Sequence, residues 1–199
     1  LGGLLSAHTL ASGSMPGASH LAVRGYRGEL LRLAVDLGDR LMSAFGACGS
    51  LPRAFVHLRG WHPKQNGKRD QCTAGVGTLL LEFGTLSRLS LDGKYEEAAL
   101  CALRTLWSKR SARNLLGNTL DVARGTWSNP SAGIGAGIDS FYEYALKSYL
   151  VFGSSELYTV WNSSYHAVLA HLRVGPWYGE SNMHAGKAEV AQFDALQQR

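Results

Sequence analysis

The sequence predicts an all-α fold made of sequential αα-hairpins with short β-hairpin insertions. Apolar residues recur at spacings of three and four along several segments, which is typical of amphipathic helices. These segments come in pairs joined by turns, and short connections make two helices antiparallel neighbours. The stretches between the pairs are longer and rich in glycine, proline and β-forming residues, which favours loops and short strands there.

The first predicted pair spans roughly residues 1–10 and 26–45. Its second helix carries an apolar stripe, formed by Leu30, Leu33, Leu37, Leu41 and Phe45. Residues 51–58 follow and favour a short strand, because β-forming residues and a proline replace the helical spacing.

The second pair spans about 76–90 and 94–110, and the turn-forming residues Asp92-Gly93 separate the two helices. The third pair spans 137–152 and 156–172, on either side of a glycine-serine turn at 153–155. The apolar positions expected to form the core of the second pair are Leu79, Leu80, Phe83, Leu86, Tyr95, Ala99, Ala102, Leu103 and Leu106.

A β-hairpin is expected between the second and third pairs, within Leu115 to Trp127. Thr119–Val122 and Thr126–Trp127 flank the turn residues Arg124-Gly125. Successive helical hairpins with such insertions indicate either a solenoid or a closed α/α toroid. The hairpins share little residue-level repetition and the linkers are long. Both features favour the toroid, in which loops between helices build a pocket at one end.

Composition and charge exclude several classes of protein. With 45% hydrophobic and 18% charged residues, global disorder is not expected. The net charge of +5 does not indicate nucleic-acid binding, because the basic residues form no stripe interleaved with aromatic residues. No run of 18 apolar residues exists, so no segment is expected to span a membrane. The first residues lack the basic and apolar regions of a signal peptide, and both ends read as cuts through helices.

The cysteines and histidines give no metal-site pattern. Cys48, Cys72 and Cys101 include no CxxC pair, which argues against structural zinc. Three cysteines permit at most one internal disulfide, and the sequence leaves the pairing open. The closest histidine pairs lie five residues apart and therefore on different faces of a helix.

Asp139 is the leading candidate for chemistry. It stands where the glycine-rich segment 133–137 meets an amphipathic helix, with Glu143 one turn later. A carboxylate at a helix mouth beside aromatic rings suits sugar chemistry, where acid/base groups and stacking platforms work together. Two other interpretations remain open. Residues 140–143 fit a capping box, which would make Asp139 part of a helix start and nothing more. The alternating glycines resemble a dinucleotide loop, although no βαβ unit precedes them.

Two further carboxylates are candidates for substrate binding. Glu82 lies inside the apolar stretch 79–83, so it must face solvent, pair with a base such as Arg88, or line a polar pocket. Glu180 lies beside two aromatic residues in the segment 176–181. Those rings could stack on a sugar or pack as an ordinary loop.

Several of these segments together resemble glycoside hydrolase family 47, the class I α-1,2-mannosidases. The nearest branch is that of the ER degradation-enhancing α-mannosidase-like proteins. The matching segments follow the family's order along nearly the whole chain. They are Leu1–His8, Cys72–Leu89, Leu116–Asn118, Gly133–Tyr144 and Trp177–Met183.

The resemblance implies an (α/α)7 barrel that hydrolyses α-1,2-linked mannose with inversion and depends on calcium. It implies that N-linked high-mannose glycans on misfolded glycoproteins are trimmed in the lumen of the endoplasmic reticulum, as part of ER-associated degradation. It also admits an oxidoreductase as a partner protein. By position, Asp139 matches the family's catalytic aspartate, while Glu82 and Glu180 match carboxylates of the sugar pocket.

The resemblance is incomplete at both ends. The family's acid glutamate would precede Leu1, and its remaining catalytic carboxylates and its calcium-binding threonine would follow Arg199. The aromatic and proline-rich segment of the family is altered at 51–57. Residues 1–199 are therefore expected to form a partial catalytic domain with no metal ligand of its own and no activity alone. The alternatives are a glycan- or partner-binding module without catalysis, or a truncated translation product without function.

Overall fold

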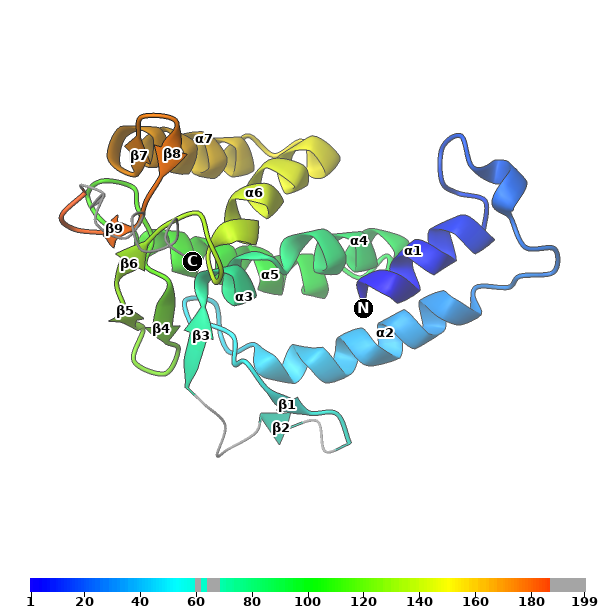
Figure 1. Cartoon of the computed structure of the whole chain (residues 1–199). Coiled ribbons are helices and arrows are strands. Elements are labelled where there is room, and N and C mark those ends of the chain that lie inside the picture. Colours follow the sequence, from blue (N-terminus) through cyan, green and yellow to red (C-terminus); the bar gives the residue numbers. More distant parts are fainter. Residues whose placement is uncertain (60–61, 64–68, 187–199) are drawn as a thin grey trace, which may run out of the picture.

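The computed structural model describes residues 1–59, 62–63 and 69–186. Three consecutive helical pairs form its main body (Figure 1), with α1 and α2 at one end, α6 and α7 at the other, and α4 and α5 between them. The bounds of these helices are α1 Gly2–Ala11, α2 Glu29–Leu41, α4 Leu80–Ser90, α5 Lys94–Ser108, α6 Asp139–Phe152 and α7 Ser155–His171.

The first helices of the pairs make one continuous set of contacts, because α4 packs against both α1 and α6. We call α1, α4 and α6 the first-helix layer. Polar contacts link the second helices. The hydroxyl of Tyr95 on α5 donates to Asp39 on α2 at 2.7 Å. Arg104 on α5 donates two hydrogen bonds to Glu156 on α7, at 2.7 and 2.6 Å, and these hold the pKa of Glu156 below its usual value.

The second and third helical pairs form largely as the sequence predicts. The chain turns between α6 and α7 at Gly153, which has φ +73°. The nine core positions expected for the second pair all pack into one hydrophobic core, with only Leu79 half-buried. The predicted helix from residue 76 is interrupted, however. The short helix α3 (Thr73–Gly77) ends before α4 begins, and Thr78 and Leu79 lie between them.

The first pair differs from its prediction in two ways. The connection from α1 to α2 is long and contains the 3-10 helix η1 (Ser19–Leu21), so it is no short turn. On α2, Leu33 is 56% exposed, whereas Ala34 and Gly38 are buried. A Cβ at Gly38 would lie 2.4 Å from Leu86 on α4, so this helix packs through its small residues. The 3-10 helix η2 (Met42–Ala44) follows directly.

Short antiparallel strands connect the pairs. The predicted hairpin at 115–127 is present, and a third strand joins it to form the sheet β3-β4-β5. Within residues 51–58 only Val56–His57 forms a strand. The strand bounds are β1 Val56–His57 paired with β2 His62–Pro63; β3 Asp70–Cys72, β4 Thr119–Asp121 and β5 Thr126–Asn129; β6 Ser131–Ala132 paired with β9 Ser181–Asn182; and β7 Arg173–Val174 paired with β8 Trp177–Tyr178.

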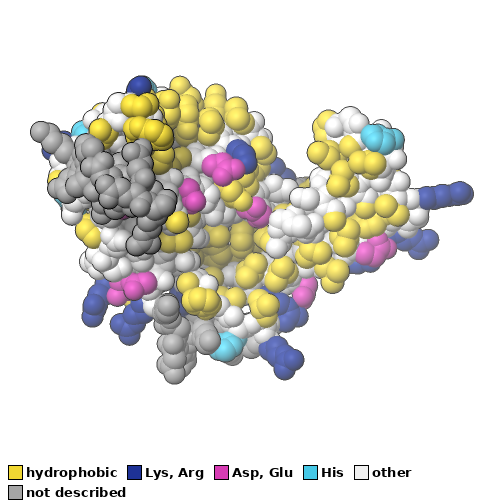
Figure 2. Space-filling model, viewed as in Figure 1, with side chains coloured by type: hydrophobic (Ala, Val, Ile, Leu, Met, Phe, Trp, Pro, Cys, Tyr) yellow, Lys and Arg dark blue, Asp and Glu magenta, His cyan; other side chains and the backbone are white. Residues whose placement is uncertain are grey.

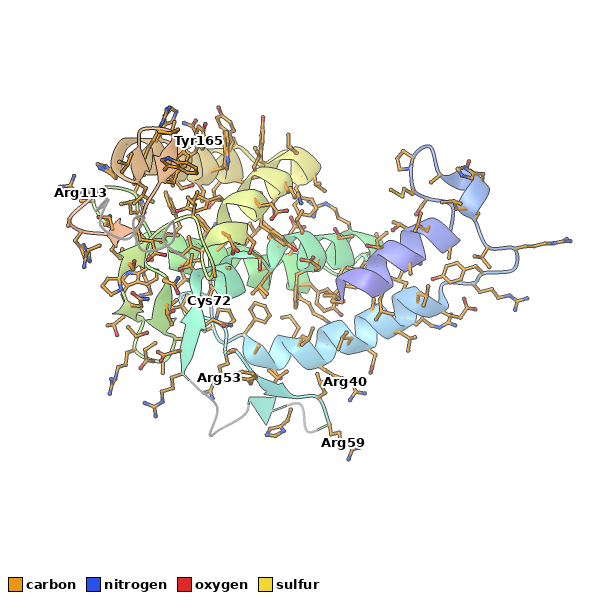
Figure 3. All side chains as sticks on the ribbon, in the orientation of Figure 1. Arg40, Arg53, Arg59, Cys72, Arg113 and Tyr165 are labelled. Atoms are coloured by element: carbon orange, nitrogen blue, oxygen red, sulfur yellow. A yellow bond between two sulfur atoms is a disulfide. The ribbon has the colours of Figure 1, made fainter. Side chains whose placement is uncertain are left out.

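Two of the cysteines form a disulfide that the sequence left unassigned. Cys48, just after η2, pairs with Cys101 on α5, and their Cα atoms lie 5.3 Å apart. The bond fastens the end of the first pair to the second. Cys72 carries a free thiol at the junction of β3 and α3 (Figure 3), where its sulfur accepts a hydrogen bond from the Gly75 amide.

Among the described helices, none combines the length and the apolarity needed to cross a bilayer.

The end of α4 stores backbone strain that a single substitution should release. Leu91 follows α4 with φ +60°, a left-handed conformation that glycine adopts more easily, and its side chain is 92% exposed. We expect Leu91→Gly to raise the free energy of unfolding by about 0.5–1 kcal/mol, because strain is lost and almost no packing is lost with it. Urea unfolding followed by circular dichroism measures this change.

Gly153 provides the matched control, because it occupies the same position after α6 with φ +73°. Gly153→Ala should lower the free energy of unfolding by about 1 kcal/mol. A shift in the same direction for both variants would contradict the assignment of strain to Leu91.

Candidate active site

The glycine-rich segment 133–137 runs from β6 to the start of α6 and is fastened on both sides. The Ala74 amide of α3 donates to the Gly137 carbonyl at 2.8 Å, and the Asn118 side-chain amide donates to the Ala136 carbonyl at 2.8 Å. Thr73 in turn donates its hydroxyl to Gly117 at 2.6 Å. Three of the sequence segments singled out above, 72–89, 116–118 and 133–144, therefore meet at this point.

Asp139 is the first residue of α6 and its side chain is exposed. Its Oδ1 accepts a hydrogen bond from the Ser140 amide at 2.8 Å, while Oδ2 has no partner among the described residues. The capping box considered for residues 140–143 is absent, since the helix begins one residue before Ser140 and Glu143 pairs with Lys147 instead.

Glu82 lies half-buried on α4, between the two other members of the first-helix layer. Its Oε1 accepts a hydrogen bond from the hydroxyl of Tyr144 on α6 at 2.9 Å. On the other side, a Cβ at Gly2 of α1 would lie 3.4 Å from Glu82 Cγ and Oε1. Arg88 pairs with Glu96 rather than with Glu82, so the ion-pair interpretation of Glu82 is wrong. Glu82 also borders a cavity of about 210 Å³ between α1 and α4.

Glu180 precedes β9 and lies against the beginning of the glycine-rich segment. Because β6 pairs with β9, Glu180 comes next to Ser131, whose hydroxyl donates to Glu180 Oε2 at 3.0 Å. A Cβ at Gly133 would lie only 3.1 Å from Glu180 Cγ. Of the two neighbouring rings, Trp177 is 59% exposed, whereas Tyr178 packs against the small hydrophobic cluster around Leu172.

The structure thus brings Glu82 and Glu180 to the segment that carries Asp139. Glu180 contacts its beginning, and Glu82 contacts Tyr144, five residues after Asp139. Within the described part of the chain, no hydrogen bond joins the three carboxylates to one another. Sequence reasoning assigned no role to Ser131, Asn118 or Tyr144. Asn118 and Tyr144 lie inside segments that were already singled out. Their hydrogen-bond partners, Ala136 and Glu82, lie 18 and 62 residues away in the sequence, so no local pattern indicates these bonds.

The absence of a basic partner sets these three carboxylates apart from most others. Acidic side chains appear near the centre of the face in Figure 2, and most lysines and arginines project from its edges. Arg40, Arg53 and Arg59 lie on the side of α2 and β1, away from α6 and α7 (Figure 3). The described carboxylates with an ion pair are Glu29, Asp36, Asp39, Asp92, Glu96, Asp121, Glu143 and Glu156. Those without one are Asp70, Glu82, Glu97, Asp139 and Glu180.

A carboxylate without a cationic partner keeps its oxygen atoms available for protons or for hydroxyl donors. The arrangement suits acid/base chemistry or recognition of a polyhydroxylated ligand. In the described residues, no three histidine, cysteine, aspartate or glutamate side chains gather around a common point.

Comparison with known proteins gives a consistent answer. Residues 1–198 match Glycosyl hydrolase family 47. The chain is 46% identical over 197 residues to alpha-mannosidase I MNS5 of Arabidopsis thaliana. The matched region covers 99% of this chain and 34% of that protein. It is 36% identical over 189 residues to the human ER degradation-enhancing alpha-mannosidase-like protein 3, and this match covers 92% of this chain and 20% of that protein. The chain therefore spans between a fifth and about a third of the length of these curated relatives.

A solved structure shows the same fold. The alpha-1,2-mannosidase from Trichoderma reesei superimposes with a TM-score of 0.78 at 28% identity, over 92% of this chain and 40% of that chain. This likeness confirms the fold class predicted from the sequence. The helical pairs form part of an (α/α)7 barrel, with short β-hairpins inserted between them.

The glycine-rich segment should tolerate a side chain at one position and not at another. Gly137 has φ +93°, and a Cβ there would lie 2.8 Å from the Asn118 side chain. We expect Gly137→Ala to lower the free energy of unfolding by about 1–3 kcal/mol, through backbone strain and the clash with Asn118. Gly135 is the matched control, since a Cβ there meets nothing within 4 Å. Gly135→Ala should change stability by less than about 0.5 kcal/mol in the same urea titration, and equal losses would refute this account of the segment.

Proposed function

We propose a function from one premise: the chain belongs to glycosyl hydrolase family 47. It forms part of the catalytic domain of an α-1,2-mannosidase-type glycoside hydrolase that trims N-linked high-mannose glycans. Relatives named as alpha-mannosidase I and as ER degradation-enhancing proteins support this substrate and its place in the degradation of misfolded glycoproteins. The domain comprises residues 1–199 together with parts of the barrel outside this chain.

The observation that carries the proposal is that three carboxylates without a basic partner among the described residues lie on or contact residues 131–144: Asp139 itself, Glu82 through Tyr144 and Glu180 through Ser131. An inverting glycosidase uses one carboxyl group as acid and another as base, about 6.5–9.5 Å apart, with a water between them. Asp139 is one catalytic carboxylate. Its Oδ2, which has no partner among the described residues, can accept a proton or a hydrogen bond from the attacking water.

Glu82 and Glu180 bind the substrate. Each has one oxygen held by a hydroxyl of the protein, from Tyr144 or Ser131, and each leaves its other oxygen as an acceptor. Mannose presents several hydroxyl donors, and hydrogen bonds to a charged acceptor are stronger than those between neutral groups. Two such acceptors on either side of Asp139 would orient a terminal mannose towards it.

We propose that the whole protein binds calcium and that the ligands of the ion lie outside this chain. The family resemblance implies a calcium ion held in part by a threonine outside residues 1–199. The described residues form no cluster that fits the ion, which prefers six to eight oxygen ligands. When bound, calcium would coordinate sugar hydroxyls at the base of the pocket.

The proposed location is the lumen of the endoplasmic reticulum, and the proposed substrates are high-mannose glycans on misfolded glycoproteins. An oxidoreductase is a proposed partner protein. An oxidising lumen is also where the Cys48–Cys101 disulfide would persist.

A second candidate is a glycan- or partner-binding module that kept the barrel and lost catalysis. One observation favours it: within the described residues, the Asp139 carboxylate contacts only Ser140 of its own helix. The two candidates differ in whether the bound glycan is cleaved.

Asp139→Asn in the full-length protein should lower mannose release by about 10²–10⁴-fold, because the amide cannot take or give a proton. Binding of the oligosaccharide should change by no more than a few-fold. Release is measured by chromatography of a high-mannose oligosaccharide. Glu97→Gln is the matched control, since Glu97 is an exposed carboxylate without an ion pair on α5 and should leave activity unchanged.

Residues 1–199 alone should release no mannose. Release by this isolated chain, lost on Asp139→Asn, would show that it is active without the rest of the barrel. A full-length protein that binds the glycan and cleaves nothing would instead support the binding module.

The full-length protein and the isolated chain should respond differently to the removal of calcium. We expect a calcium chelator to abolish mannose release by the full-length enzyme, and added calcium to restore it. The isolated chain should keep the same thermal midpoint with calcium or with chelator, because its described residues offer no metal cluster. A calcium-dependent rise in that midpoint would place the ion within residues 1–199.

A further inference from the structure

Tyr144 makes the one hydrogen bond between a side chain of α6 and a side chain of α4 in the described part of the chain. Its hydroxyl donates to Glu82 Oε1 at 2.9 Å, across 62 residues of sequence. Tyr144 lies on the same helix as Asp139, five residues later. The bond therefore ties the helix of the proposed catalytic carboxylate to the helix of a proposed substrate-binding carboxylate.

The opposite side of Glu82 is closed by α1. The backbone at Gly2 comes so near that a Cβ would lie 3.4 Å from Glu82 Cγ and Oε1. The Glu82 side chain thus lies between a rigid backbone and a hydroxyl donor. Such a side chain loses little further conformational entropy when a ligand binds, because it is already ordered.

Glu82 Oε2 remains without a partner in the described residues, beside the cavity between α1 and α4. Ser6 and Thr85 also line this cavity, and neither hydroxyl makes a hydrogen bond within the described residues. The wall thus presents one carboxylate oxygen and two free hydroxyls. This chemistry matches a sugar, whose hydroxyls both donate and accept.

The Tyr144 hydroxyl is suited to hold a carboxylate permanently. Burial, together with the hydrogen bond to Glu82, raises the pKa of Tyr144 to about 12. The group therefore keeps its proton at every pH at which the protein would work, and it remains a donor. Phenylalanine fills nearly the same space and lacks this donor.

We infer that Tyr144 is a positioning residue, which fixes the Glu82 carboxylate so that its free oxygen receives a mannose hydroxyl. This inference rests on the proposed function, because it assigns Tyr144 a part in substrate binding by that site. Tyr144 acts through Glu82 and takes no part in proton transfer.

The test compares Tyr144→Phe, Glu82→Gln and the double variant in the full-length protein. With a high-mannose oligosaccharide as substrate, we expect Tyr144→Phe to raise KM about tenfold and to change kcat less than about twofold, as for a lost hydrogen bond to a charged group. Glu82→Gln should raise KM more. The double variant should match Glu82→Gln, because Tyr144 has nothing left to position.

Tyr149→Phe is the matched control. It removes a hydroxyl from the same helix, the Tyr149 ring packs on Tyr158, and the hydroxyl that donates to Glu82 in the described residues is that of Tyr144. A KM for Tyr144→Phe equal to that of Tyr149→Phe, or losses that simply add in the double variant, would overturn the inference while leaving the proposed function intact.

Failure of the proposed function has a different signature. Wild-type protein that neither cleaves nor binds the oligosaccharide would overturn both. If the wild-type protein binds the oligosaccharide without cleaving it, the dissociation constants of the same variants decide the inference. The expected changes are the same: about a tenfold rise for Tyr144→Phe and no addition of losses in the double variant.

Discussion

Close approach of consecutive helices at glycine residues is the constraint on which the rest of this structure depends. A Cβ at Gly38 would lie 2.4 Å from Leu86, one at Gly77 would lie 2.6 Å from Phe141, and one at Gly84 would lie 2.8 Å from Phe152. The first contact joins α2 to α4, the second joins α3 to α6, and the third joins α4 to α6. Because protein interiors are close-packed, even one methyl group at such a point would displace the facing side chain or the helix that carries it. The spacing between the pairs is therefore set by residues that have no side chain.

This spacing determines where the carboxylates lie. Glu82 lies between α1 and α6, where Gly2 approaches it on one side and the Tyr144 hydroxyl donates to it from the other. The second helices are joined differently, through the ion pair of Arg104 with Glu156. Basic residues thus satisfy the acidic group on that side, and a neutral hydroxyl satisfies Glu82. Under the proposed function, this neutral partner leaves Glu82 without a competing cation where a sugar hydroxyl would bind.

The sequence predicts those elements whose signal is local. The apolar stripe of α5 is fully buried as expected, and α6 ends at the predicted glycine. The stripe of α2 fails at Leu33 because that helix buries small residues, and hydrophobic periodicity cannot identify Ala34 and Gly38 as the contact face. The three candidate carboxylates could be named from motifs. The Tyr144–Glu82 bond and the Cys48–Cys101 disulfide could not, because each depends on a tertiary contact between residues more than 50 positions apart.

The arrangement also explains why catalysis would need more than these residues. Inversion requires two carboxyl groups that face each other across a sugar and a water. Among the described residues, the Asp139 side chain makes hydrogen bonds only to Ser140, while Ser131 donates to Glu180 and Tyr144 donates to Glu82. Under the proposed function these three carboxylates would line the sugar pocket. Under the proposed function, the facing carboxyl group must come from the part of the barrel that the relatives have and this chain does not cover. The chain can then be ordered around its glycine contacts and still cleave nothing alone, because its helix packing and its chemistry depend on different parts of the barrel.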